Sequence, residues 1–310
     1  MKTPRNSLTR RELVHWIAAG TLASALPSRA EEPVRTMATR AVPGSREAIP
    51  VIGMGSSNTF DVGASDAERA PLGEVLRALT DAGGTVIDTS PMYGRAEQTI
   101  GDLVESLGLR SRLWFATKVW TRGREAGREQ IEESFRRLRT DRLELLQIHN
   151  LLDWREHVPT IRSLQQQGKV RYSGITHYRA DAHAELERVL GEERFDWVQF
   201  NYSLAEREAE QRLLPFCMDR GVAVMINRPF ADGALFARVR GKPLPPWAAE
   251  VGCASWAQYF LRFAISHPAV TCAIPATSKP QHMRDNAAAG AAPLPDEQQR
   301  HRMAKYFQAL

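Results

Sequence analysis

Cysteine is scarce in this sequence, and no hydrophobic run after residue 30 is long enough to span a membrane. Its 310 residues include three cysteines, Cys217, Cys253 and Cys272, and no CxxC pair. Three thiols cannot all pair, which excludes a disulfide framework, and we expect them to be small buried apolar residues. A dense group of His, Asp and Glu is also missing, which disfavours a metal-dependent hydrolase, and we expect no metal.

The first thirty residues have the three parts of an export signal. Arg10 and Arg11 form a twin-arginine pair, residues 16–26 are apolar, and a small-x-small site ends at Ala30. We therefore predict a Tat-type signal peptide over 1–30, recognition by the Tat translocase, and a periplasmic or otherwise exported protein. A membrane anchor is the alternative, but the apolar stretch is shorter than the roughly 20 residues that span a bilayer, so we expect no stable anchor.

The positive charge of the chain belongs to this segment. The full sequence has a net charge of +5 and a pI near 9.3. Without residues 1–30 it has 36 basic and 35 acidic residues, a net charge of +1. No basic stripe interleaved with aromatic residues occurs, so we expect no nucleic-acid partner.

Short β-branched or aliphatic runs alternate with amphipathic stretches over the rest of the chain, a pattern typical of βα units and a parallel sheet. The predicted strands are 50–53, 85–88, 113–117, 143–148, 170–175, 197–200, 222–226 and 270–274. The predicted helices are 66–81, 95–108, 125–140, 155–168, 180–190, 206–219, 253–266 and 279–289, with an extra helix over 296–309.

Eight such units in about 250 residues favour a single-domain (β/α)8 TIM barrel over residues 49–310, after a flexible leader over 31–48. A doubly wound open sheet is the competing architecture. It is disfavoured because no GxGxxG follows the first predicted strand. Two insertions, at 151–154 and 228–252, are expected at the rim, and the second is long enough to be functional.

An acid, a phenol, an amine and an imidazole follow three successive predicted strands: Asp88, Tyr93, Lys118 and His149. The carboxyl ends of barrel strands are where this architecture gathers its chemistry, so we expect the four side chains to meet. Taken singly, each has a structural alternative: a helix cap, a core or rim ring, a solvated charge and a buried imidazole. Independent packing roles would not place four complementary groups at one end of the barrel.

Five motifs occur together in one order. They are Asp-Thr-Ser-Pro-Met-Tyr-Gly at 88–94, Thr-Lys at 117–118, Leu-Leu-Gln-Ile-His-Asn at 145–150, Gln-Phe-Asn-Tyr-Ser at 199–203 and Ile-Pro-Ala-Thr-Ser-Lys-Pro-Gln-His-Met-Arg-Asp-Asn at 274–286. Over almost the whole of residues 31–310 the sequence resembles the aldo-keto reductase family. The resemblance implies reduction of an aldehyde or ketone by hydride from a nicotinamide cofactor, and we expect a monomer.

The four polar residues suit such a reduction. The carbonyl oxygen gains negative charge, so a proton donor must lie close to it. An unperturbed tyrosine titrates at about 10, and we expect the neighbouring Lys118 to lower the pKa of Tyr93. Tyr93 is then the general acid and Asp88 anchors Lys118. His149 orients and polarises the carbonyl.

The resemblance implies NADP(H), with NAD(H) possible, extended across the strand ends without a Rossmann fold. The implied cofactor-binding positions are Gly55, Ser56, Ser57, Thr176, His177, Gln199, Asn227, Arg228, Pro229, Phe230, Thr277, Ser278, Lys279, His282, Asp285 and Asn286. Thr277, Ser278, Lys279 and His282 resemble the 2′-phosphate site, and Asp285 and Asn286 would reach the adenine. An ordinary capped helix is the alternative for 277–279.

Several of these positions depart from the family pattern. His177 stands where relatives usually have Asn, and Asn227 stands where many have a Tyr that stacks on the nicotinamide ring. A common Arg is absent at His282. These departures affect how the ring is held and how strongly NADPH is preferred over NADH.

We expect the substrate pocket to be lined by Phe60, Met92, Trp120 and Trp154, an apolar wall that suits aldehydes and ketones in general. The two tryptophans could equally brace the barrel mouth. A redox-sensing module that binds NADP(H) with little turnover is the alternative function. If export is real, the cofactor would be bound before translocation and retained.

Overall fold

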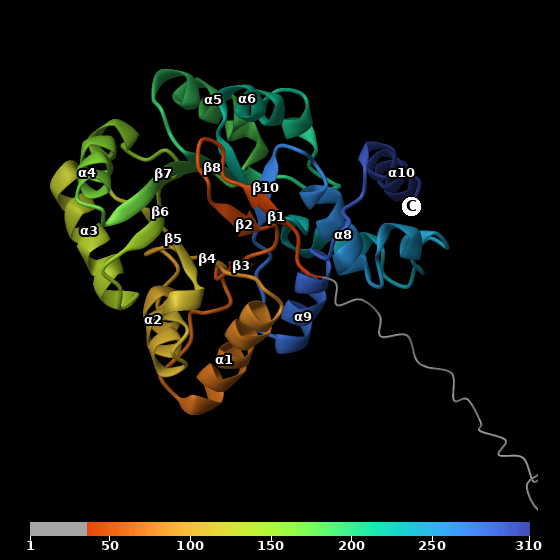
Figure 1. The fold of residues 1–310 in the computed structure, drawn as a ribbon, viewed down its shortest axis with the longest axis horizontal. Coiled ribbons are helices and arrows are strands. Elements are labelled where there is room, and N and C mark those ends of the chain that lie inside the picture. Colours follow the sequence, from red (N-terminus) through yellow and green to blue (C-terminus); the bar gives the residue numbers. More distant parts are fainter. Residues whose placement is uncertain (1–35) are drawn as a thin grey trace, which may run out of the picture. The chain divides into compact units, whose positions relative to one another are not determined.

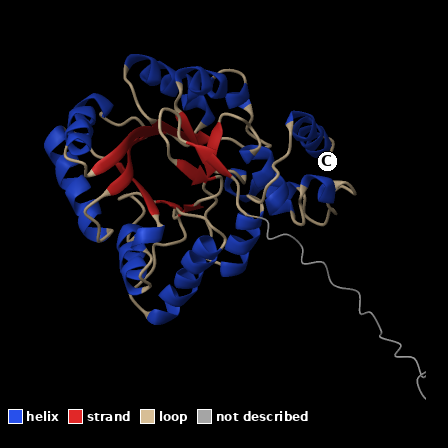
Figure 2. Cartoon of the chain, in the orientation of Figure 1, coloured by secondary structure: helices blue, strands red, loops and turns tan. Residues whose placement is uncertain are grey.

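The computed structural model describes residues 36–310; the expected signal peptide and the first part of the leader lie outside the described residues. Eight parallel strands form one sheet in the order β10-β9-β8-β7-β6-β5-β4-β3. Bridges between Ile52 and Ala273 and between Gly55 and Ala276 join its two edge strands. The sheet is therefore closed, and the predicted (β/α)8 barrel is confirmed (Figures 1 and 2).

The barrel strands are short and almost entirely buried. Their bounds are β3 Met54–Gly55, β4 Val86–Asp88, β5 Trp114–Val119, β6 Leu143–His149, β7 Val170–Thr176, β8 Trp197–Asn201, β9 Ala223–Asn227 and β10 Val270–Ala273. Burial on both faces explains why they appear in the sequence as continuous apolar runs.

Helices surround the strands on the outside of the barrel (Figure 2). They are α1 Asp66–Asp81, α2 Ala96–Ser106, α3 Arg124–Arg137, α4 Trp154–Gln166, α5 His183–Glu192, α6 Leu213–Arg220, α8 Trp256–Ile265 and α9 Pro280–Ala288. Ser65 caps α1 by accepting from the backbone N–H of Glu68. The helix predicted from residue 206 begins only at 213, because residues 208–210 form a separate 3-10 turn.

Two helices lie outside the repeating pattern. The insertion 228–252 contains α7 (Ala234–Arg238), and the chain ends with α10 (Glu297–Gln308). Asp296 and Gln299 form a capping box at the start of α10. The hydroxyl of Tyr259 in α8 donates to the carbonyl oxygen of Met303 at 2.9 Å and so joins α10 to α8.

The leader does not remain irregular up to residue 48, contrary to prediction. β1 (Thr39–Ala41) and β2 (Ala48–Pro50) form an antiparallel hairpin, drawn in red and orange in Figure 1. Gly44, at φ 71°, lies in the turn between them. The run 50–53, predicted as the first barrel strand, therefore ends the hairpin, and the barrel strand is the shorter β3.

The hairpin forms because two of its side chains fill the barrel. Val42 and Ile49 are 1% and 2% exposed and pack with the inward-facing apolar residues of the strands. That interior includes Trp114 and Trp197, whose ring centroids lie 5.4 Å apart. One end of the barrel is thus filled by apolar side chains.

The inward face changes from apolar to polar along each strand. In β6, where alternate residues share a face, Leu145 belongs to the apolar interior, and Gln147 and His149 follow it toward the carboxyl end. Neighbouring strands follow the same order, because Lys118 pairs in register with Gln147 and Thr176 with Gln199. The polar ends of the strands form the candidate site.

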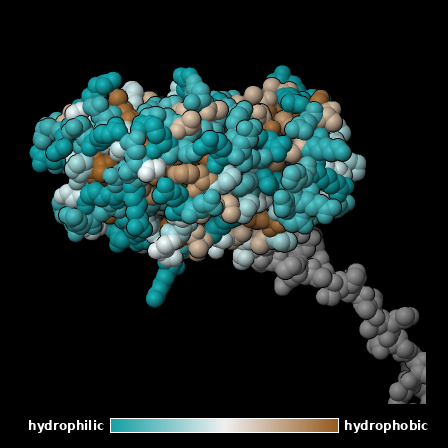
Figure 3. Space-filling model, turned by 90° about the horizontal axis from the view of Figure 1, so that it is seen from above, coloured by the Kyte–Doolittle hydropathy of each residue, from teal (hydrophilic) through white to brown (hydrophobic). Residues whose placement is uncertain are grey.

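The face of the molecule seen in Figure 3 is mainly hydrophilic with scattered apolar residues. Among residues 36–310, no helix combines the length and the apolar character that crossing a bilayer requires.

Candidate active site

A buried ion pair lies at the centre of the site. Lys118 Nζ is 2.6 Å from Asp88 Oδ2, and the two side chains are 0% and 3% exposed. The ammonium also donates to the carbonyl oxygen of Thr89 at 2.7 Å. Asp88 Oδ1 accepts from Nε2 of Gln147 at 3.1 Å and of Gln199 at 2.9 Å. These bonds replace much of the hydration that both charges lose on burial.

The geometry keeps Lys118 charged. Burial lowers the pKa of Lys118, but the Asp88 carboxylate and the interaction with Tyr93 raise it, and the net effect is an increase. The ammonium lies 5.1 Å from the centroid of the Tyr93 ring. Lys118 therefore presents a fixed positive charge to the phenol.

Tyr93 lies in the loop between β4 and α2. Its carbonyl oxygen accepts from the backbone N–H of Ala96 at 3.0 Å. Burial raises the pKa of Tyr93, and Lys118 and a hydrogen bond with Ser57 only partly oppose this effect. The predicted net lowering was therefore wrong in sign, although the effect of Lys118 has the expected direction. The phenol stays protonated at neutral pH, the form that a general acid needs.

His149 ends β6 beside Tyr93. Burial and the charge of Lys118 lower the pKa of His149 from 6.5 to about 2, so the imidazole is neutral. Its ring meets the Tyr93 ring edge-on at a centroid distance of 6.0 Å. The phenol and the imidazole can therefore contact one common reactant, as the sequence predicts.

The expected nicotinamide positions form a connected network at the ends of β7, β8 and β9. Gln199, whose Nε2 donates to Asp88, accepts from Asn227 Nδ2 at 3.3 Å. Asn227 Nδ2 also lies 3.4 Å from the carbonyl oxygen of His177, and Thr176 is buried in the sheet. Asn227 Oδ1 is buried without a hydrogen-bond partner in the part of the chain that the structure describes. A carboxamide N–H fits this unpaired acceptor.

The amino end of α9 fits an anion. Lys279 directly precedes the helix and makes no side-chain capping hydrogen bond, and the first turn contains no acidic residue. Ser278, Lys279 and His282 are exposed, and Thr277 Oγ1 accepts from the backbone N–H of Lys279 at 3.1 Å. Free N–H groups and a cation at a helix amino end suit a phosphate.

Asp285 departs from the expected role at the adenine. Its two carboxylate oxygens accept from Ser255 Oγ and Gln258 Nε2, both at 2.7 Å, and so join α9 to the start of α8. Asn286 is 3% exposed. Asp285 is thus engaged within the protein, and Asn286 has little surface to offer.

Arg228 is also engaged within the protein. Its guanidinium donates to the carbonyl oxygen of Tyr178 at 2.8 Å and pairs with Asp232 at 2.9 Å and Glu206 at 3.3 Å. These contacts hold the insertion 228–252 against the loops after β7 and β8. Next to Arg228, Pro229 is buried, and Phe230 packs on Phe236 and Phe260.

Gly55 and Ser56 belong to the closing edge of the barrel. A Cβ on Gly55 would lie 2.8 Å from the carbonyl oxygen of Ile274, so only glycine lets the strands approach. Ser56 is fully buried, and its Oγ has no partner among residues 36–310.

Comparison with known proteins identifies the family of this chain. A family model described as "Aldo/keto reductase family" matches residues 51–302. The chain belongs to the aldo-keto reductase family. It is 32% identical over 247 residues to methylglyoxal reductase YeaE of Escherichia coli (strain K12), a match that covers 77% of this chain and 85% of the relative. Membership of this family of oxidoreductases agrees with the resemblance that the five sequence motifs indicate.

Two further relatives bear on the cofactor. A Klebsiella pneumoniae aldo-keto reductase solved in complex with NADPH has a TM-score of 0.74 at 29% identity, covering 87% of this chain and 96% of that one. The NADH-specific methylglyoxal reductase of Escherichia coli (strain K12) is 27% identical over 195 residues, 53% of this chain and 57% of the relative. Relatives of this aldo-keto reductase thus include one solved with NADPH and one named as NADH-specific.

The expected substrate wall of this aldo-keto reductase is only partly available. We call Asp88, Tyr93, Lys118 and His149 the tetrad. Met92 and Trp120, beside it, are each 40% exposed, and the Trp120 ring centroid lies 6.4 Å from that of His149. Trp154 is half-buried and packs on the core and on Arg155. Phe60 is 0% exposed within the core, so the prediction that it lines the pocket was wrong.

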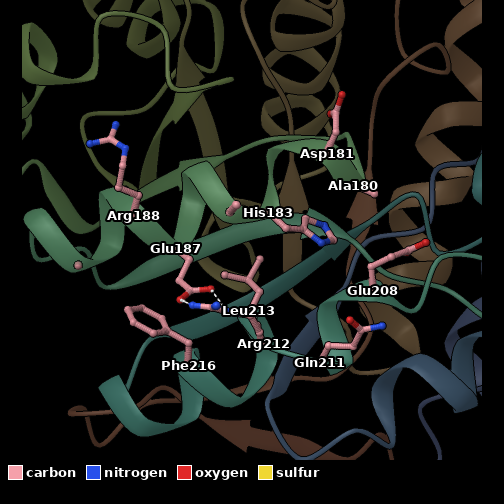
Figure 4. A pocket seen from close by; sticks show the side chains of 12 residues that line it. Ala180, Asp181, His183, Glu187, Arg188, Glu208, Gln211, Arg212, Leu213 and Phe216 are labelled. Atoms are coloured by element: carbon pink, nitrogen blue, oxygen red, sulfur yellow. Dashed lines mark hydrogen bonds and ion pairs between the residues drawn. The ribbon is translucent and has the colours of Figure 1, made fainter.

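A surface groove lies between α5 and α6 (Figure 4). Its lining residues include His183, Phe216 and the ion pair of Glu187 with Arg212 at 2.5 Å. It contains none of the four tetrad residues. Among residues 36–310, no three His, Cys, Asp or Glu side chains are grouped to hold a metal.

Sequence reasoning missed three members of the site: Thr89, Ser90 and Gln147. Thr89 and Ser90 lie within the motif 88–94, and Ser90 Oγ is 3.2 Å from His149 Nδ1. Gln147 precedes His149 by two residues on β6, so strand alternation alone would have placed it on the same face.

Proposed function

We propose that this protein reduces an aldehyde or ketone to the alcohol with hydride from a nicotinamide cofactor, and that Tyr93 is the general acid. One observation carries the proposal: a protonated phenol lies over the buried Lys118–Asp88 pair and faces the neutral imidazole of His149. The cofactor, when bound, supplies the hydride, which no protein side chain can provide.

Each side chain has a definite task in this reaction. The carbonyl carbon gains hydride while its oxygen takes the phenolic hydrogen of Tyr93, and the phenolate is later reprotonated from solvent. The ammonium of Lys118 stabilises the phenolate as it forms, and Asp88 keeps that ammonium in place. His149 orients the carbonyl oxygen toward Tyr93.

The residues present suit NADP(H). Asn227 offers the carboxamide an oxygen that has no partner within residues 36–310, next to Gln199, Thr176 and His177. The amino end of α9 with Lys279 suits the 2′-phosphate. The NADPH complex of the Klebsiella pneumoniae relative supports this preference, and the NADH-specific relative makes NADH the second cofactor to test.

A panel of aldehydes, ketones and quinones, each assayed with NADPH and with NADH, tests the proposal. We expect turnover with at least one carbonyl class and a lower KM for NADPH than for NADH. Tight cofactor binding without turnover on any carbonyl would instead favour the redox-sensing module. That module has no physical need for a buried lysine–aspartate pair beneath a phenol.

Export is a separate proposal. The twin-arginine pattern, apolar stretch and small-x-small site of residues 1–30 suit Tat export to the periplasm, a route that transports folded proteins. We infer that the cofactor is bound before translocation and retained. The exported protein should keep the absorbance of reduced nicotinamide after dialysis; an empty exported protein would contradict retention alone.

A further inference from the structure

Ser90 contacts the imidazole of His149 from within the motif that supplies Asp88 and Tyr93. Its Oγ lies 3.2 Å from His149 Nδ1, and the serine is fully buried. The proposed reaction assigns no task to this hydroxyl. A buried hydroxyl on the ring that faces the carbonyl can decide which ring nitrogen carries hydrogen.

The surroundings of Ser90 fix the direction of this hydrogen bond. The backbone N–H of Met92 donates to Ser90 Oγ at 3.4 Å, so the oxygen already accepts one hydrogen bond. Among residues 36–310, His149 Nδ1 is the only acceptor recorded for the serine hydroxyl hydrogen. A buried O–H left without an acceptor is costly, so Ser90 donates and Nδ1 accepts.

The acceptor role of Nδ1 determines the rest of the ring. Burial and Lys118 lower the pKa of His149 to about 2, so the imidazole carries a single ring hydrogen. If Nδ1 accepts, that hydrogen is on Nε2. Nε2 has no hydrogen-bond partner recorded among the described residues, which leaves it free for a ligand. An Nε2–H can donate to a carbonyl oxygen, whereas the other tautomer would present a lone pair to it.

We propose that Ser90 is a positioning residue that holds His149 in the Nε2–H tautomer, so that the imidazole donates to the substrate carbonyl oxygen. The last step rests on the proposed carbonyl reduction. The tautomer itself does not, and it can be measured without any substrate.

The direct test is the long-range proton–nitrogen correlation spectrum of the purified protein labelled with ¹⁵N-histidine. The His149 signals are assigned by their loss in His149→Gln. We expect wild-type His149 to show a protonated Nε2 and an unprotonated Nδ1, and Ser90→Ala to increase the Nδ1–H form. A wild-type ring protonated on Nδ1 would overturn the proposal, and this result needs no variant at Ser90.

Kinetics supply the second test. Ser90→Ala should lower kcat about tenfold, as expected for one lost hydrogen bond, while the KM for the cofactor changes less than twofold. Ser90→Cys, which keeps a weak donor, should recover part of kcat. Thr99→Val is the matched control, because this buried hydroxyl in α2 has no partner among the described residues.

The outcomes separate the two proposals. An unchanged kcat in Ser90→Ala, or an equal loss in Thr99→Val, would contradict the positioning role. If wild type reduces no carbonyl in the panel, the proposed function fails, and the spectrum still decides the tautomer.

Discussion

At the residue scale, the site depends on an ion pair that neither partner could sustain alone. A buried ammonium without a counter-charge would lose its hydration without any compensating interaction, and so would an isolated buried carboxylate. Lys118 and Asp88 are stable here because they lie 2.6 Å apart and three further groups hydrogen-bond to them. The pair is a functional feature with a folding consequence.

Asp88→Asn should therefore destabilise the protein by about 3–5 kcal/mol, because it leaves Lys118 buried without its counter-charge. Denaturant unfolding of the variant and of wild type measures this difference. The double variant Asp88→Asn/Lys118→Met should regain most of the lost stability and no carbonyl reduction. Wild-type stability in the single variant would show that the pair is not buried as described.

How far the site could be predicted also depends on the residue. Asp88, Tyr93, Lys118 and His149 were predictable together, because each lies at or just beyond the carboxyl end of a strand, and these ends share one rim. The rise in the pKa of Tyr93 was not, because it depends on burial that only the assembled rim produces. The engagement of Asp285 depends on α8, thirty residues earlier in the chain.

At the element scale, seven of the eight barrel strands were predictable within a few residues, because parallel strands buried on both faces leave continuous apolar runs. The hairpin of β1 and β2 was not. Its apolar residues Val42 and Ile49 are isolated in a stretch that also contains Pro43 and Gly44, so no periodic pattern marks them. They are buried only because they pack against the strands of the assembled barrel. The two-residue β3 is too short for any periodicity.

Ile49→Ala should destabilise the protein by about 2–4 kcal/mol, since Ile49 fills the end of the barrel opposite the tetrad. Chemical denaturation measures the change. Arg46→Ala in the exposed turn of the same hairpin is the control and should stay within about 0.5 kcal/mol of wild type. Equal effects of the two substitutions would mean that the hairpin does not plug the barrel.

At the scale of the whole molecule, packing and chemistry occupy opposite ends of one barrel. The hairpin and a core containing Trp114 and Trp197 fill one end, and the polar ends of the strands form the other. This division resembles that of barrel enzymes in general, in which loops after the strands vary while the opposite end supports stability. The folded protein also buries two neutral histidines, His149 and His267, whose protonation in acid favours unfolding.

Stability should fall as pH drops below about 6.5, because the pKa of His149 is lowered from 6.5 to about 2 and that of His267 to about 4. Between pH 6.5 and the lowered pKa of each histidine, the unfolded chain binds a proton that the folded protein does not, which favours unfolding in acid. Each histidine contributes up to about 1.4 kcal/mol per pH unit. Both histidines titrate in this direction because they are buried.

Unfolding free energies measured between pH 6.5 and 5 check this. His149→Gln should show a shallower decline with falling pH than wild type, because the contribution of His149 is removed while those of His267 and His177 remain. An identical slope in the variant would show that His149 is protonated in the folded protein.

The central claim is that Tyr93, whose ring lies over the Lys118–Asp88 ion pair, donates the proton to the carbonyl oxygen during reduction. The most direct measurement is the single-turnover rate of carbonyl reduction at saturating cofactor in wild type and in Tyr93→Phe, with the cofactor Kd measured in parallel. We predict that the rate falls by about 10²–10⁴ while the Kd changes only a few-fold. A Tyr93→Phe protein that reduces the carbonyl at the wild-type rate would contradict the account.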